Sequence, residues 1–172
     1  MEYSIDDIEG PLEGRIIRLD STVDERLASE VCDRLLFLES QDSEREICLY
    51  IDSPGGALTA VMAIYDTMRY ITVPVITVCT GRAVSMAAFL LAAGEPGMRF
   101  ALPDSHIVLQ PLTVGEWRHS DEKLHMEALN RIFAENTGLP YEDMVDAAAG
   151  ESGLSAADAR DLGIIDQILL SS

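Results

Sequence analysis

Short apolar runs alternate along this chain with longer segments in which apolar residues recur every three or four positions. The runs ICLYI (47–51) and VITVC (75–79) are continuously apolar, which is typical of strands buried on both faces of a parallel sheet. Each run ends in small residues and is followed by a segment with helical spacing, at 57–70 and at 84–93. Strand alternating with helix predicts βαβ units with right-handed crossovers, and therefore an α/β fold.

The rest of the chain extends this pattern in both directions. The predicted strands are 15–19, 44–53, 74–80, 99–103, 105–110 and 164–170, and the predicted helices are 23–39, 57–70, 84–93, 119–136, 140–149 and 155–162. Residues 1–14 contain Gly10, Pro11 and Gly14 and show no sustained period, so an extended or mobile arm is expected there.

Two of the strand-to-helix turns carry residues that could perform chemistry. Gly55 and Gly56 precede a helix, whose first backbone N–H groups have no internal partners and can bind an anion. Ser85 opens the next helix, where its hydroxyl would lie in the positive field of the helix N-terminus. The residues alone leave two interpretations open: a tight turn and a capping serine, or a nucleophile beside an oxyanion hole.

Composition narrows the class of protein. With 172 residues, 48% of them hydrophobic, the chain suits one domain with a real core. Its net charge of −18 disfavours nucleic acid and anionic membranes as partners, because phosphates would be repelled. Cys32, Cys48 and Cys79 lie on apolar stretches without metal-like spacing, which predicts reduced, buried thiols, a cytoplasmic location and no metal. Neither a signal peptide nor a membrane helix is expected, since no apolar run follows Met1 or reaches the length of a bilayer span.

Four strings in this order resemble the proteolytic subunit of the Clp protease, ClpP, a serine peptidase of the crotonase-like fold. They are LYIDSPGGALTAVMAIYDTM, GRAVSMAAFLLAAGEPGMRFALPDS, NRIFAENTG and LSAADARDLGIIDQI. The resemblance implies repeated ββα units in a single domain over 15–172, after a short N-terminal arm over 1–14. The head would comprise roughly 15–110 and 138–172, and the handle roughly 111–137. This handle is shorter than the family pattern by about seven residues, or about two helical turns, which should weaken the stacking of two rings.

The same resemblance places a catalytic triad and an oxyanion hole on this sequence. Ser85 falls on the nucleophile, and Gly56 and Met86 fall on the oxyanion donors. Gln110 falls on the place of the histidine base, and a glutamine cannot accept a proton at physiological pH. Glu151 falls on the place of the aspartate.

Three histidines remain as possible substitutes for the missing base. His106 is the alternative base, although it lies four residues before Gln110 on the same predicted strand, about 13 Å away. His119 and His125 fall in the following loop and helix and are expected to be solvated. The oxyanion cradle is therefore retained while the proton acceptor has departed.

The sequence favours a catalytically impaired ClpP-family subunit with a structural or regulatory role. The expected partners are copies of itself in a heptameric ring or an active ClpP paralogue, with an AAA+ unfoldase as a further candidate, and no cofactor is implied. One alternative is an active Clp-type serine endopeptidase that uses a non-standard base, either His106 or a residue donated by another subunit. A second alternative is a crotonase-like acyl-thioester enzyme, which would use the amides near Gly56 and Met86 to hold a thioester oxyanion.

Overall fold

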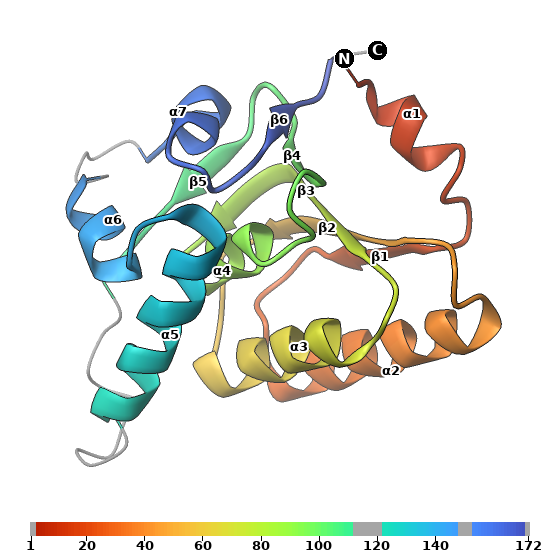
Figure 1. Ribbon diagram of the computed structural model, residues 1–172, viewed down its shortest axis with the longest axis horizontal. Helices are drawn as coiled ribbons and strands as arrows, with labels where there is room; N and C mark the ends of the chain where they lie inside the picture. The colour runs from red at the N-terminus through yellow and green to blue at the C-terminus, as the bar shows by residue number, and fades with distance from the viewer. Residues whose placement is uncertain (1–2, 112–121, 148–152, 171–172) are drawn as a thin grey trace.

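A parallel sheet flanked by helices forms the centre of the computed structural model, which describes residues 3–111, 122–147 and 153–170 (Figure 1). The strands are β1 (Ile16–Leu19), β2 (Ile47–Ser53), β3 (Val75–Val84), β4 (Arg99–Ala101), β5 (His106–Val108) and β6 (Gln167–Ile168). The strand order is β1-β2-β3-β4-β6, with β5 also paired to β3, and every strand pair is parallel. The predicted α/β fold with alternating strands and helices is confirmed.

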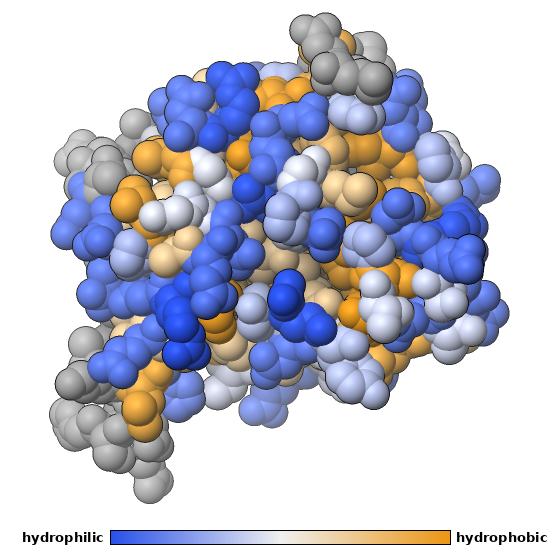
Figure 2. Space-filling view, viewed as in Figure 1, coloured by the Kyte–Doolittle hydropathy of each residue, from blue (hydrophilic) through white to orange (hydrophobic). Residues whose placement is uncertain are grey.

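Seven helices are described around this sheet. They are α1 (Ile5–Glu9), α2 (Glu25–Gln41), α3 (Leu58–Tyr70), α4 (Met86–Ala92), α5 (Glu122–Thr137), α6 (Tyr141–Ala147) and α7 (Ala156–Asp161). The helices α2 and α3 lie side by side across one face of the sheet, and α1 lies on the other side (Figure 1). Figure 2 shows hydrophilic residues over most of the visible surface, with hydrophobic residues in patches between them.

Alternate residues of β2 supply both faces of the sheet with core side chains. Leu49 and Ile51 pack into the main core with α2, α3 and α4, whereas Cys48 and Tyr50 pack into a second, smaller core. All four are at most 3% exposed, as expected of a parallel strand covered on both sides.

The N-terminal segment is not the extended arm that we predicted. Ser4 caps α1 in a capping box with Asp7, and the helix buries Ile8 and the following Leu12 against the second face of the sheet. The phenol of Tyr50 donates a hydrogen bond to Glu9 at 3.1 Å, which ties α1 to β2. Burial of two large apolar side chains outweighs the weak local period that suggested an arm.

Several boundaries also differ from the predictions. The strand predicted over 74–80 runs on to Val84, because its last three residues pair with β5. The helix predicted over 84–93 therefore starts only at Met86. The closing strand predicted over 164–170 is reduced to Gln167–Ile168, since the residues before it form the turn that brings Asp166 to Arg99.

Candidate active site

Ser85 occupies a strained turn between β3 and α4. Its φ of 54° and ψ of −115° make it the only residue other than glycine with positive φ in the described part of the chain. Such backbone costs about 1–3 kcal/mol and persists only where the surroundings hold it. The Ser85 N–H donates to the carbonyl of Val108 at 2.7 Å, and the Ser85 carbonyl accepts from the N–H of Phe89 at 3.2 Å.

The Ser85 side chain does not cap α4, although Ser85 stands at its N-cap position. The interpretation of Ser85 as a capping serine is therefore wrong. The helix it precedes is buried over all seven of its residues, so the serine stands at the end of a rigid, apolar element. A serine on a sharp strand-to-helix turn is the arrangement in which a hydroxyl is presented to a substrate.

The diglycine loop lies directly against this turn. Gly55 has φ +92°, and a Cβ there would lie 2.6 Å from the Val84 carbonyl oxygen and 3.4 Å from the Met86 nitrogen. Gly56 forms a bridge with Val23, and a Cβ at Gly56 would lie 2.1 Å from the Val23 carbonyl oxygen. Only glycine fits at either position. The lack of a side chain at both is what allows this loop to pack against the serine turn.

The first backbone amide of α4 lies at the same place. Met86 is the first residue of the helix, so its N–H has no acceptor within the helix. Its closeness to Gly55 brings the loop and the helix N-terminus together at Ser85. This arrangement agrees with an oxyanion site, while the assignment of Gly56 and Met86 as its donors stays a prediction.

A tyrosine that the sequence pattern did not single out stands beside the serine. Tyr141, the first residue of α6, is 1% exposed, and its phenol donates a hydrogen bond to the Gln110 carbonyl at 2.9 Å. The Ser85 side chain is close enough to the same phenol to influence its pKa. Burial raises the pKa of Tyr141 above its ordinary value of 10.0, against the opposing effect of hydrogen bonds with Ser85 and with the Gln110 backbone.

Gln110, which falls on the place of the base, lies just after β5 with an exposed side chain. The hydrogen bond from the Ser85 N–H to the Val108 carbonyl, two residues earlier, holds this segment close to Ser85, and the Gln110 carbonyl accepts a further bond from Tyr141. The segment on which the family has its histidine is therefore next to the serine, as the resemblance implies.

His106 is the first residue of β5 and lies away from Ser85. It is exposed and pairs with Arg82 in the strand register, three residues before Ser85 on β3, which is about 10 Å along a strand. It lines a surface pocket of about 390 Å³ with Asp104 and Asp158. Tyr141 lines a different pocket, of about 320 Å³.

Of the remaining predicted site residues, the structure describes only one. His125 lies on α5 with an exposed side chain. His119 and Glu151 lie outside the described residues. The roles assigned to Ser85, Gln110, Glu151 and His106 therefore stay predictions.

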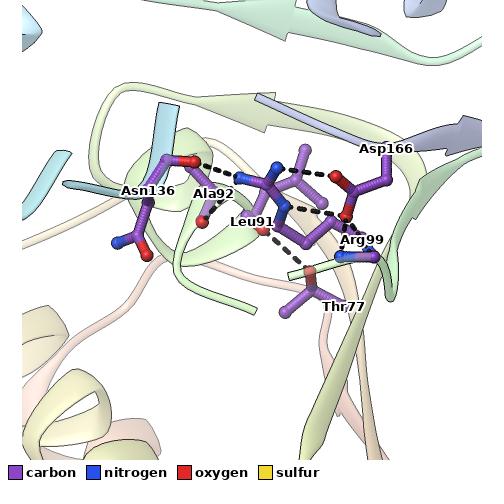
Figure 3. Close-up of polar contacts among 7 residues, drawn as sticks. Thr77, Leu91, Ala92, Arg99, Asn136 and Asp166 are labelled. Atoms are coloured by element: carbon purple, nitrogen blue, oxygen red, sulfur yellow. Dashed lines mark hydrogen bonds and ion pairs between the residues drawn. The ribbon is translucent and has the colours of Figure 1, made fainter. Parts of the chain in front are cut away.

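A buried ion pair holds the C-terminal end of α4, the helix that follows Ser85 (Figure 3). The Arg99 guanidinium bonds Asp166 at 2.7 Å and also donates to the carbonyls of Ala92, at the end of α4, and Asn136, in α5. Thr77 of β3 adds a hydrogen bond to the Leu91 carbonyl at 2.7 Å. One arginine thus connects β4, α4, α5 and the turn before β6.

Metal and membrane roles gain no support from the described residues. Within 3–111, 122–147 and 153–170, no group of three or more His, Cys, Asp or Glu side chains is placed to hold a metal ion. No helix in these same ranges has the length and apolar character needed to cross a bilayer. Cys48 and Cys79 are buried as predicted, whereas Cys32 is only partly buried.

The parallel sheet with alternating helices, the strained serine and the diglycine loop beside it together define a class: an α/β protein consistent with the crotonase-like fold, with a serine at a strand-to-helix turn. A comparison with protein families identifies the family within that class. The model of the Clp protease family matches residues 2–172. The chain therefore belongs to the Clp protease family, in agreement with the resemblance of its four sequence strings.

Proposed function

We propose that this ClpP-family subunit is catalytically impaired and serves as a structural or regulatory member of a ring. The observation that carries the proposal is the residue beside the nucleophile position. By the resemblance, Gln110 falls on the place of the family's proton acceptor, and its backbone carbonyl accepts a hydrogen bond from the neutral phenol of Tyr141. Serine needs a base within hydrogen-bond reach to become a nucleophile, and neither an amide nor a neutral phenol supplies one at pH 7.

The scaffold on which a ring subunit depends supports the same proposal. The sheet and the two long helices α2 and α3 form a complete core. Toward the C-terminal ends of these helices, Leu36, Phe37 and Tyr70 are 42%, 51% and 78% exposed. Large exposed apolar side chains at neighbouring helix ends are typical of surfaces that meet another subunit. The proposed partners are further copies of this chain, in a heptameric ring, or an active paralogue; an AAA+ unfoldase is a further candidate for the same surface.

Peptidase activity tests the impairment. The purified protein, alone and co-expressed with an active paralogue, is incubated with a fluorogenic peptide and a fluorophosphonate probe, next to an active family member. Loss of the base should lower kcat/KM by at least about 10²–10⁴-fold relative to that control, and Ser85→Ala should change the remainder little. Robust turnover that Ser85→Ala abolishes would show the proposal to be wrong.

The same assay separates the two alternatives. A working peptidase that relies on His106 would lose its activity in His106→Ala and would gain rate as an imidazole deprotonates. An acyl-thioester enzyme would bind acyl-CoA, which isothermal titration detects. Native mass measurement, alone and with the paralogue, tests the ring: a monomer under both conditions contradicts the structural role.

A further inference from the structure

A surface pocket of about 320 Å³ opens between α5 and α6, next to the segment that carries Gln110. Two helices and the end of that segment form its walls, and the lining residues are Pro111, Met126, Tyr141, Glu142, Val145 and Asp146. Tyr141 is buried and Met126 and Val145 are half-buried, whereas the side chains of Glu142 and Asp146 are exposed. The pocket therefore has an apolar floor and two carboxylates at its rim.

This pocket lies close to the turn at Ser85. The Tyr141 phenol donates a hydrogen bond to the Gln110 carbonyl at 2.9 Å, and Pro111 is the next residue of the chain. On the same segment, the Val108 carbonyl accepts the Ser85 N–H at 2.7 Å. Three residues of extended chain, from Val108 to Pro111, cover about 10 Å. A peptide that runs along this segment to reach Ser85 therefore passes the pocket.

The floor of the pocket is held in place by the packing of α6 on α5. The Tyr141 ring packs edge-on against Phe133 of α5, with ring centroids 5.2 Å apart, and both rings are at most 1% exposed. The backbone N–H of Glu142 donates to the side-chain oxygen of Asn130 at 3.1 Å, which joins the start of α6 to α5. The pocket is therefore preformed, as ligand sites usually are.

The two carboxylates are placed where they do not stabilise α6. Glu142 and Asp146 are four residues apart on the helix, a spacing at which like charges repel. Asp146 also lies in the last turn, which contains no basic residue and where the helix dipole disfavours a carboxylate. None of the six described residues that line the pocket is basic. The arrangement points to a cation that comes from another molecule.

We propose that this pocket binds the side chain of a lysine or arginine in a peptide that lies at the Ser85 turn. The methylene stem of such a side chain packs on the apolar floor, and its charged end meets Glu142 and Asp146 at the rim. This inference rests on the proposed function and deepens it. It names the class of peptide that an impaired subunit with an intact serine turn holds.

Peptide binding to the full chain, followed by fluorescence anisotropy, tests the proposal. The chain carries Ser85→Ala, so that no peptide is cleaved during the measurement. The probes are labelled alanine-based octapeptides in which one lysine, or one norleucine, occupies each position in turn. In the register that fills the pocket, lysine should bind about fivefold more tightly than norleucine, the equivalent of contacts with two exposed carboxylates. Salt should reduce this difference, because exposed charges are screened.

Conservative variants assign the effect to the pocket. Glu142→Gln and Asp146→Asn should each weaken binding of the best lysine peptide by about two- to threefold and leave the norleucine peptide unchanged. Asp143→Asn is the matched control, because it removes the same charge from an exposed position on α6 that does not line the pocket. This variant should leave the affinity for both peptides unchanged.

Four results would overturn the inference. The first is no saturable binding of any peptide, and the second is equal affinity for lysine and norleucine at every position. The third is an equal effect of Asp143→Asn and Glu142→Gln, since the net charge of −18 would then be what attracts the cation. The fourth is an unchanged peptide affinity in Glu142→Gln with an altered native mass, which would make the pocket a subunit contact.

These outcomes are separate from a failure of the proposed function. Robust turnover by the chain with Ser85 intact would refute the impairment, but it would leave the affinities measured with Ser85→Ala as they are. Conversely, a chain without peptidase activity could still bind lysine and norleucine peptides equally, and only the assignment of the pocket would then be wrong.

Discussion

Replacing Asp166 with asparagine should destabilise the fold far more than its position near the surface suggests. The Asp166 carboxylate accepts bonds from the N–H groups of Gly97 at 2.8 Å and Arg99 at 3.1 Å, and from the Arg99 guanidinium at 2.9 and 2.7 Å. An amide oxygen can replace one carboxylate oxygen, but the amide nitrogen must then face a donor. The variant therefore leaves a guanidinium on a side chain only 7% exposed without its counter-charge.

The magnitude follows from this geometry. Removing one partner of a buried ion pair costs about 3–5 kcal/mol. We expect about 2–3 kcal/mol here, because the Asp166 side chain is 22% exposed and Arg99 keeps its bonds to the Ala92 and Asn136 carbonyls. For a chain of this length, the melting temperature should fall by about 5–10 °C.

The effect should also depend on pH. Burial alone would raise the pKa of Asp166, but the hydrogen bonds and charge of Arg99, with the N–H of Gly97, outweigh it and hold the pKa below its ordinary value of 3.8. A pKa that is lower in the folded state contributes stability that is complete above the unfolded pKa and is lost as the pH falls through the folded one. The difference in the free energy of unfolding between parent and variant should therefore be full at pH 7 and should shrink as the pH falls below 3.8.

Urea unfolding at one fixed protein concentration, followed by circular dichroism, measures this difference without a contribution from changing assembly. Asp161→Asn is the matched control. It removes the same charge from a side chain that is 72% exposed and lies 3.4 Å from Arg160, so it should cost less than about 1 kcal/mol. If Asp166→Asn unfolds like Asp161→Asn at pH 7, the Arg99 ion pair does not hold the fold together as argued.

Two further predictions concern the diglycine loop and the thiols. Gly56→Ala should cost at least about 2–3 kcal/mol in urea unfolding, since its Cβ would meet the Val23 carbonyl oxygen at 2.1 Å. Gly97→Ala, with φ +86° but open space around it, should cost only about 1–2 kcal/mol, and equal losses would contradict the packing argument. Burial raises the pKa of Cys48 to about 12, so in the folded protein at pH 8 Ellman's reagent should label Cys32 first, and prompt labelling of Cys48 would refute its burial.

The sequence pattern predicted the elements whose hydrophobic period is set locally. The run 47–51 is a strand buried on both faces, and the segments predicted as helices over 23–39 and 57–70 are α2 and α3 within two residues at each end. The N-terminal helix was missed although Ser4 and Asp7 have the spacing of a capping box, because two glycines and a proline nearby suggested a loop.

The serine turn could be located from sequence, but the long-range side-chain contacts around it could not. Ser85 and the diglycine loop are marked by residue types that a strained turn requires. Tyr141 and Asp166 instead reach their partners, Gln110 and Arg99, across 31 and 67 residues of chain. No local period or spacing reports such contacts, because only the folding of the whole sheet brings them together.

The contacts that hold the diglycine loop and the Ser85 turn limit what their presence says about activity. Gly55, Gly56 and the turn at Ser85 are held in place by contacts with backbone atoms, so their replacement would damage the fold whether or not the protein cleaves peptides. The Gln110 side chain is exposed and supports no comparable contact in the described structure. A subunit that lost its base would therefore be expected to keep its oxyanion loop and serine turn for stability alone. The identity of the proton acceptor is thus more informative about function than the SPGG loop, and the prediction that Gln110 takes its place is the one on which the proposed impairment depends.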